Sequence, residues 1–376
     1  MRMKRKLAAL LLIGALAGAG QPAQAATPGW THDGYGPGNT GYNPAESTVN
    51  SSTIKKLKLK WRAVPDEGSE GCFEQVTPVA ADGRVFFRDG DGVGAVDLKS
   101  GKWLWSNTTV MDSDVHRTLT VAGGLLITTG YSCYGVSDPS GHIVALDVKT
   151  GKVKWSILEL SATEHVLVDK NILVSYSVCE VCDSYGVTAY RLSDGAELWS
   201  RDGQLASPVS ANGRLLLAEP DGSGAVAVSV KNGKALWYTG NAWSALAANP
   251  AGDQFYVTGF DNELAAVSAA TGKVLWSVPD AAGSLAADGT RVYVSQFSGM
   301  TAYSAKNGNQ LWHRGGVWSD RPVRAGGLLY VTGSILSPVN GALVMNATYS
   351  GDYHHAVVVG GRVLRVKGYE IQAYGL

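Results

Sequence analysis

Residues 144–155 read Val-Ala-Leu-Asp-Val-Lys-Thr-Gly-Lys-Val-Lys-Trp, and this phrase decides the fold because it recurs. Residues 94–105 repeat it as Gly-Ala-Val-Asp-Leu-Lys-Ser-Gly-Lys-Trp-Leu-Trp, and weaker copies end at Trp199, Trp237, Trp276 and Trp312. Each copy joins a small apolar run, through a turn with Gly, to an alternating polar and apolar run. This is the pattern of two β-strands joined by a hairpin. Residues 57–61, Leu-Lys-Leu-Lys-Trp, keep only the last strand.

The tryptophans that end these runs lie 36 to 50 residues apart, which is the period of four-stranded propeller blades. Two further strand signals, A and B, precede each phrase, which itself supplies strands C and D. Eight A-B-C sets begin near Gln75, His116, Glu164, Leu205, Trp243, Ser284, Asp320 and His354. The sequence therefore predicts an all-β, eight-bladed β-propeller, or a seven-bladed one if the degenerate unit at residues 342–351 is absorbed.

Two of the eight sets lack a recognisable strand D. One is the set that contains residues 342–351, and the other is the last set, which ends after its strand C. We expect Leu57–Trp61 to supply the last strand D, because closing the ring in this way removes an exposed sheet edge. Tryptophans at regular positions are then interpreted as packing between blades rather than as a ligand platform.

The first residues have the features of an export signal: a basic start, an apolar run over residues 7–19, and Ala23-Gln24-Ala25 as a cleavage site. The sequence predicts a signal peptide at 1–25, an N-terminal wrapping segment at 26–56 and the propeller at 57–376. Removal of the signal leaves a net charge of −4, which excludes a basic footprint for nucleic acid. We expect a monomer that is secreted or in the cell envelope and has no membrane insertion.

At these residues the chain resembles a known family. Ala-x-Asp-x-x-Thr-Gly-Lys-x-x-Trp is similar to the tryptophan docking motif of pyrroloquinoline-quinone (PQQ) type propeller repeats, and residues 33–44 resemble the segment before the first blade of that superfamily. The resemblance covers about residues 30–376. In the dehydrogenases of this superfamily the quinone lies in the channel with calcium, above a disulfide between adjacent cysteines. This sequence has no adjacent cysteine pair.

Four cysteines, Cys72, Cys133, Cys179 and Cys182, form an even set, which favours two disulfides in an exported protein. All four fall in D-to-A or B-to-C connections of neighbouring blades, which open on one face. Cys72–Cys133 with Cys179–Cys182 is the preferred pairing. A four-cysteine zinc site or a redox-active Cys179-x-x-Cys182 are the alternatives, and the sequence predicts no metal site.

The first residues of the A strands predict a ring of polar groups around the channel mouth. The candidate ligand-binding residues are Arg117, Glu164, His165, Asp320, Arg321, His354 and His355, together with Trp243, which like Trp318 precedes an A strand outside the repeat. Convergent polar groups in a concave mouth make a ligand site. The alternative is a mutually paired ring that only keeps the channel wet.

We expect a secreted scaffold or binding module that holds a protein partner or a small ligand at this mouth, without a cofactor. It resembles the short PQQ-repeat proteins, which include outer-membrane assembly scaffolds, but lacks their lipoprotein cysteine. The alternatives are an oxidoreductase that uses PQQ with calcium and a lyase or hydrolase at the same mouth. Asp320, His354 and His355 are the candidate catalytic residues, and the sequence leaves open whether the protein is an enzyme.

Overall fold

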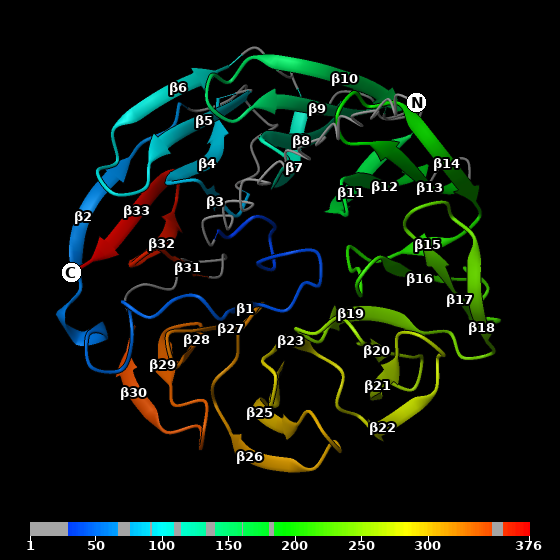
Figure 1. The fold of residues 1–376 in the computed structure, drawn as a ribbon. Helices are drawn as coiled ribbons and strands as arrows, with labels where there is room; N and C mark the ends of the chain where they lie inside the picture. The colour runs from blue at the N-terminus through cyan, green and yellow to red at the C-terminus, as the bar shows by residue number, and fades with distance from the viewer. Residues whose placement is uncertain are drawn as a thin grey trace, which may run out of the picture.

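The computed structural model describes residues 29–66, 76–90, 92–108, 114–132, 140–159, 161–179, 184–347 and 356–376. Eight antiparallel sheets stand around one axis like the blades of a propeller (Figure 1). The predicted all-β, eight-bladed fold is confirmed, and the seven-bladed alternative is wrong. The one helical turn among the described residues is η1 (Ile54–Lys56).

The strands follow chain order from the axis outward in blades 1 to 7, whereas blade 8 takes its outer strand from the N-terminal part of the chain. Blades 1 to 4 are β3 (Val79–Ala81), β4 (Arg84–Asp89), β5 (Gly92–Asp97), β6 (Trp103–Asn107); β7 (Asp114–Ala122), β8 (Leu125–Ser132), β9 (Gly141–Asp147), β10 (Val153–Glu159); β11 (Ala162–Asp169), β12 (Ile172–Cys179), β13 (Ser184–Arg191), β14 (Glu197–Asp202); and β15 (Leu205–Ala206), β16 (Arg214–Ala218), β17 (Ala225–Ser229), β18 (Ala235–Thr239). Blades 5 to 8 are β19 (Ser244–Ala248), β20 (Gln254–Thr258), β21 (Leu264–Ser268), β22 (Val274–Val278); β23 (Ser284–Ala287), β24 (Arg291–Gln296), β25 (Gly299–Ser304), β26 (Gln310–Arg314); β27 (Val323–Ala325), β28 (Leu328–Val331), β29 (Ser334–Leu336), β30 (Leu343–Asn346); and β31 (Val357–Val359), β32 (Arg362–Lys367), β33 (Glu370–Gly375), β2 (Lys58–Ala63).

This up-and-down order gives the ring two distinct faces. A-to-B and C-to-D turns open on one face, which we call the A–B face. B-to-C and D-to-A connections open on the other, which we call the D–A face. The predicted polar ring belongs to the D–A face.

The N-terminal strand closes the ring as predicted. Strand β2 pairs antiparallel with β33, with Arg62 opposite Gln372, and becomes the outer strand of blade 8. The expectation that residues 342–351 contain no strand D is wrong. Leu343–Asn346 form β30 on β29, with the bulge that the other outer strands carry, so blade 7 is complete without a tryptophan.

Seven tryptophans hold neighbouring blades together, as the sequence predicts. Each indole Nε1–H donates to a backbone carbonyl in the C-to-D turn of the next blade, over 2.8–3.1 Å; the donors are Trp61, Trp105, Trp155, Trp199, Trp237, Trp276 and Trp312. Each ring lies against the glycine of that same turn. A Cβ on Gly272, for example, would lie 2.7 Å from the Trp237 ring. The repeated Gly and Trp are therefore two halves of one contact.

The N-terminal segment, residues 29–43, lies inside the ring and bonds to the innermost strand region of every blade in turn. The partner residues from blade 1 to blade 8 are Ala80, Val121, Val168, Ser210, Ala248, Ala287, Arg324 and Val358. In blade 7 this contact extends into a short parallel pairing of β1 (Tyr42–Asn43) with β27. The inner edge strands would otherwise leave backbone groups without partners, so this segment satisfies at least one group in each blade. Figure 1 shows it as the blue trace at the centre of the ring.

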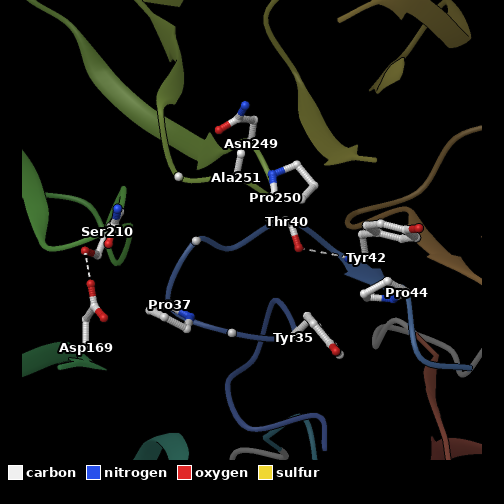
Figure 2. A pocket seen from close by; sticks show the side chains of 14 residues that line it. Tyr35, Pro37, Thr40, Tyr42, Pro44, Asp169, Ser210, Asn249, Pro250 and Ala251 are labelled. Carbon is white, nitrogen blue, oxygen red and sulfur yellow. Dashed lines mark hydrogen bonds between the residues drawn. The ribbon is translucent and has the colours of Figure 1, made fainter. Parts of the chain in front are cut away.

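Close approach of this segment requires special backbone geometry. Gly41 has a φ of +59°, and a Cβ there would lie 2.9 Å from the Pro322 carbonyl oxygen. Figure 2 shows Tyr35, Pro37 and Thr40 on this part of the segment. The glycine-rich composition of the segment therefore serves contact with the inner strands.

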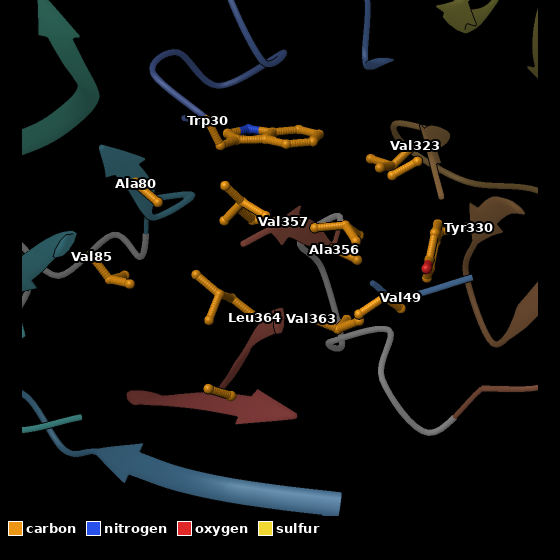
Figure 3. Close-up of a cluster of buried hydrophobic side chains, with 14 of the residues drawn as sticks. Trp30, Val49, Ala80, Val85, Val323, Tyr330, Ala356, Val357, Val363 and Leu364 are labelled. Atoms are coloured by element: carbon orange, nitrogen blue, oxygen red, sulfur yellow. The ribbon is translucent and has the colours of Figure 1, made fainter. Parts of the chain in front are cut away.

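The residues that follow this segment, 46–54, cross the boundary between blades 7 and 8, where no tryptophan joins the described strands. Val49 and Ile54 are fully buried there, in a cluster with Trp30 and Val357. Figure 3 shows Trp30 and Val49 among side chains of blades 1, 7 and 8. The Glu46 carboxylate accepts backbone N–H groups of Thr48, Val49 and, in blade 8, Gly361. Residues 46–54 thus join the one pair of blades that lacks the tryptophan contact in the described structure.

His32 is the titratable contact of this segment. Its Nε2 accepts the backbone N–H of Val168 at 3.2 Å, so the ring proton is on Nδ1, which donates to Thr31 Oγ1 at 3.0 Å. Burial lowers the pKa of His32 to about 4. The folded protein therefore needs the neutral ring.

We predict that Gly272→Ala destabilises the protein more than Gly83→Ala. Both glycines have a φ near +70°, at +71° and +73°, but the site at Gly83 has open space around the new Cβ. The left-handed backbone costs both variants about 1–2 kcal/mol, and the clash with Trp237 adds about 1–3 kcal/mol to the first alone. Urea unfolding measures both. Equal losses would contradict the tryptophan–glycine contact.

We predict that acid weakens the fold through His32. An unfolded histidine binds a proton below pH 6.5, but the folded one does so only below about 4. Stability therefore falls as the pH drops from 6.5 to 4, by about 3 kcal/mol for this group. His32→Gln keeps an acceptor for Val168 and should flatten this part of the curve of unfolding free energy against pH. An unchanged slope would show that His32 does not titrate as described.

Candidate functional site

A cleft of about 460 Å³ opens on the D–A face, where blades 5, 6 and 7 meet. The lining comes from B-to-C turns and D-to-A segments: Asn262, Ala282, Gly283, Ser284, Ser295, Gln296, Phe297, Trp318, Ser319 and Asp320. Phe297 is fully exposed, and 49% of Trp318 is exposed. Two large exposed rings at one cleft make this surface a candidate interaction site.

Hydrogen bonds hold the turns of this cleft in place. Gln296 Nε2 donates to the carbonyls of Asp280 and Ala282, at 2.8 and 3.1 Å, which ties the Phe297 turn to the segment before blade 6. The Ser319 N–H donates to Ser295 Oγ at 2.7 Å, which ties the Trp318 segment to β24. The turns that carry Phe297 and Trp318 are therefore held by hydrogen bonds, so binding would require little ordering of their backbone.

Asp320 is the predicted residue that this cleft contains. Its side chain is exposed beside Trp318. Trp318 has the solvent-facing position expected of it. Trp243 does not: only 2% of it is exposed, and it packs in the core with Val209 and Phe255. The expectation of a wet role for Trp243 is wrong, because its ring fills the space between blades 4 and 5.

Arg321 binds two side chains of the N-terminal segment. Its Nη1 lies 2.9 Å from Asp33 Oδ2 and 3.0 Å from Asn39 Oδ1. Residues 33 and 39 lie far from it in the chain, and the sequence carried no sign of this pairing. The partners of Arg321 in the described structure therefore make it an anchor for the chain's own segment.

His165 and Glu164 lie at a separate place in blade 3. The His165 ring stacks on Tyr176, with ring centroids 4.9 Å apart, and borders a cavity of about 10 Å³. That volume suits one water molecule at most. Burial lowers the pKa of His165 to about 4, and its buried Nε2 has no hydrogen-bond partner among the described residues. Glu164 is half-buried. The pKa of Tyr176 is raised to about 12, mainly by burial of Tyr176 and to a smaller extent by the nearby Tyr185 and Glu164.

The remaining predicted residues are outside what the structure describes. Arg117 lies on β7, but its side chain is not described, and His354 and His355 lie outside the described residues. Cys179 is buried and disulfide-bonded, whereas Cys72, Cys133 and Cys182 lie outside the described residues. The cysteine pairing and the roles of the two histidines therefore stay predictions.

Sequence reasoning missed Phe297 and Phe260. Phe260 occupies the B-to-C turn of blade 5, is 81% exposed and lies against Gly222 in the corresponding turn of blade 4. A phenylalanine within a tight turn, as in Gly259-Phe-Asp-Asn-Glu, was the available signal. It was overlooked because the repeat explained most other aromatic residues as packing.

A second groove, of about 340 Å³, lies near the axis on the A–B face. The N-terminal segment forms one wall with Tyr35, Pro37 and Tyr42, and the A-to-B turns of blades 4 and 5 form the other. Figure 2 shows Asn249 and Pro250 across from these residues, with Ser210 bonded to Asp169. It contains no residue of the predicted polar ring.

The residues described around the channel do not fit a quinone with calcium. Arg321 is occupied by Asp33 and Asn39, and Trp243 is buried between blades instead of forming a channel floor. No group of three His, Cys, Asp or Glu side chains within the described ranges could hold a metal ion. We derive no chemical step through that cofactor.

No helix in the described ranges is long and apolar enough to cross a membrane.

Comparison with known proteins agrees with this architecture. Residues 58–216 and 221–364 match the family model PQQ_2, described as outer membrane protein assembly factor BamB. The chain is 29% identical over 219 residues to the outer membrane protein assembly factor BamB of Bordetella pertussis, covering 56% of this chain and 50% of that protein. It is 31% identical over 122 residues to the dehydrogenase subunit of the quinone alcohol dehydrogenase of Gluconobacter oxydans, covering 31% of this chain and 15% of that protein. The chain thus spans half or less of the length of these curated relatives.

Solved structures show the same fold at low identity. The quinohemoprotein alcohol dehydrogenase of Comamonas testosteroni superposes with a TM-score of 0.66 at 12% identity, covering 93% of this chain and 80% of that one. BamB of Moraxella catarrhalis superposes with a TM-score of 0.63 at 15% identity, covering 85% of this chain and 100% of that one. Since the family model matches most of the chain, from the closing strand β2 to β32 in blade 8, this protein belongs to the PQQ_2 family of PQQ-like β-propellers.

Proposed function

We propose that this protein is an exported, non-catalytic propeller that binds a protein partner through its D–A face. The observation that carries the proposal is the cleft between blades 5, 6 and 7, where Phe297 and Trp318 are exposed on hydrogen-bonded turns beside Asp320. Exposed aromatic side chains on rigid supports are typical centres of protein interfaces. The cleft opens on the D–A face, for which the sequence also predicts the polar ring.

The family relationship supports a binding role. BamB is named as an assembly factor of outer membrane proteins, and the relationship in sequence covers more than half of this chain. The interior of the ring supports it as well, because residues 29–43 occupy the inner strand edges of all eight blades. Binding at a face needs no rearrangement of that segment. We place the protein in the cell envelope or outside the cell, as its N-terminal sequence predicts.

Quinone-dependent oxidation is the contrasting function, since another relative is the dehydrogenase subunit of a quinone alcohol dehydrogenase. We expect purified protein to gain no quinone absorbance and no dye-linked alcohol oxidation when PQQ and calcium are added. Bound quinone with turnover would overturn the non-catalytic proposal.

We predict that Phe297→Ala with Trp318→Ala abolishes partner capture. The measurement is a pull-down from the envelope and extracellular fractions, with captured proteins identified by mass spectrometry and confirmed by direct binding of the purified partner. The double variant loses the aromatic anchors and should retain no partner. Tyr238→Ala is the matched control, because Tyr238 is 75% exposed but lies on the outer strand β18.

A partner that the double variant binds as tightly as the wild type would contradict the site. Thermal unfolding followed by circular dichroism shows that both variants keep the fold. If the wild type and Tyr238→Ala capture the same partner and the double variant does not, the result would support the D–A face as the interface.

A further inference from the structure

The two faces of blades 4 to 6 differ in charge. The connections on the D–A face are residues 219–224, 240–243, 259–263, 279–283, 297–298 and 315–322; they contain one basic residue, Arg321, which is paired with Asp33, and six acidic residues: Glu219, Asp221, Asp261, Glu263, Asp280 and Asp320. The lysines of the same blades lie in or directly after the C-to-D turns of the A–B face, at Lys231, Lys234, Lys273 and Lys306. In these connections acidic side chains outnumber basic ones by five, so this part of the face favours positively charged partners.

The acidic side chains lie among the exposed aromatic rings. Asp261 follows Phe260 directly, and Asp320 follows Trp318 by two residues. Asp261, Asp280 and Asp320 are all exposed. Aromatic faces attract cations, and carboxylates beside them strengthen that attraction. The arrangement therefore favours a partner that presents positive charges next to apolar side chains.

The exposed rings extend across three neighbouring turns. The Phe260 ring reaches over Gly222, where a Cβ would lie 2.3 Å from Phe260 Cε2. The Ala282 N–H donates to the Asn262 carbonyl at 3.0 Å, which ties the Phe260 turn to the wall of the cleft. Phe297 and Trp318 continue this surface along the cleft. Several anchors in a row suit an extended polypeptide better than one small cation.

We propose that this surface, formed by Phe260, Phe297, Trp318 and the acidic residues between them, binds an extended basic segment of a partner protein in which lysine or arginine alternates with aromatic or aliphatic residues. The proposal rests on the proposed function and names the chemistry of its partner. An acidic segment or an anionic membrane would meet repulsion from the six carboxylates.

The test uses the full-length mature protein and synthetic peptides as probes. A fluorescent peptide of alternating lysine and phenylalanine is compared, by anisotropy, with a glutamate and phenylalanine peptide and with a lysine and serine peptide. We expect the lysine and phenylalanine peptide to bind about tenfold more tightly, or better, than either of the others, since both charge and rings contribute. Its affinity should fall with added salt.

Two variants locate the binding. The triple variant Asp261→Asn, Asp280→Asn and Asp320→Asn should lose most of the salt-dependent affinity, and Phe297→Ser should lose about tenfold. Glu197→Gln is the control, because Glu197 is exposed on the outer strand β14, away from the cleft. Unchanged binding of the lysine and phenylalanine peptide by the triple variant would overturn the proposal, as would its failure to bind the wild type.

The two proposals fail in different ways. Tighter binding of the glutamate and phenylalanine peptide, with loss on Phe297→Ser, would overturn the basic partner while leaving the D–A face as a docking site. If Phe297→Ala with Trp318→Ala still captures its protein partner, the proposed function fails as well. Binding of anionic lipid vesicles in preference to the basic peptide would also overturn the proposal.

Discussion

The inner edges of the blades set the constraint on which the rest of this structure depends. Eight A strands face the axis with one side unpaired, and unpaired backbone groups in a protein interior are costly. Residues 29–43 answer this by giving each inner strand region a hydrogen-bond partner, in chain order from blade 1 to blade 8. The segment can come so close because it is rich in glycine, with Gly41 in the left-handed region against Pro322.

The same segment explains why the ring can close without an eighth tryptophan. Seven boundaries rely on an indole that donates to the next blade and lies over its glycine. At the remaining boundary the chain leaves the axis, buries Val49 and Ile54, and binds Gly361 through Glu46. Strand β2 then completes blade 8. One continuous stretch therefore joins the inside of the ring, the boundary that lacks a tryptophan contact and the outer edge of blade 8.

Because the N-terminal segment occupies the interior of the ring, the exposed surfaces near the axis are on its two faces. Arg321, which the sequence suggested as a ligand residue, is held by Asp33 and Asn39 of the segment. Phe297 and Trp318 instead stay exposed on turns that are themselves hydrogen-bonded. In blades 4 to 6, acidic side chains outnumber basic ones in the connections of that face, while the lysines lie on the other face. The two faces of these blades therefore differ in chemistry, which supports the proposal that a partner binds the D–A face.

The sequence by itself determined the all-β fold, the eight units, the closing strand and the packing role of seven tryptophans. These follow from local patterns, because alternation, glycine turns and a repeated period are visible along the chain. It misjudged residues 343–346, whose strand β30 forms by pairing with β29 although it carries no tryptophan signal. The site was predicted less well: Asp320 and Trp318 lie at the cleft, but Trp243 is buried and Arg321 bonds to a segment almost 300 residues away. Only the tertiary structure decided these points, since exposure and ion pairing depend on which distant residues meet, and local sequence carries no record of those distances.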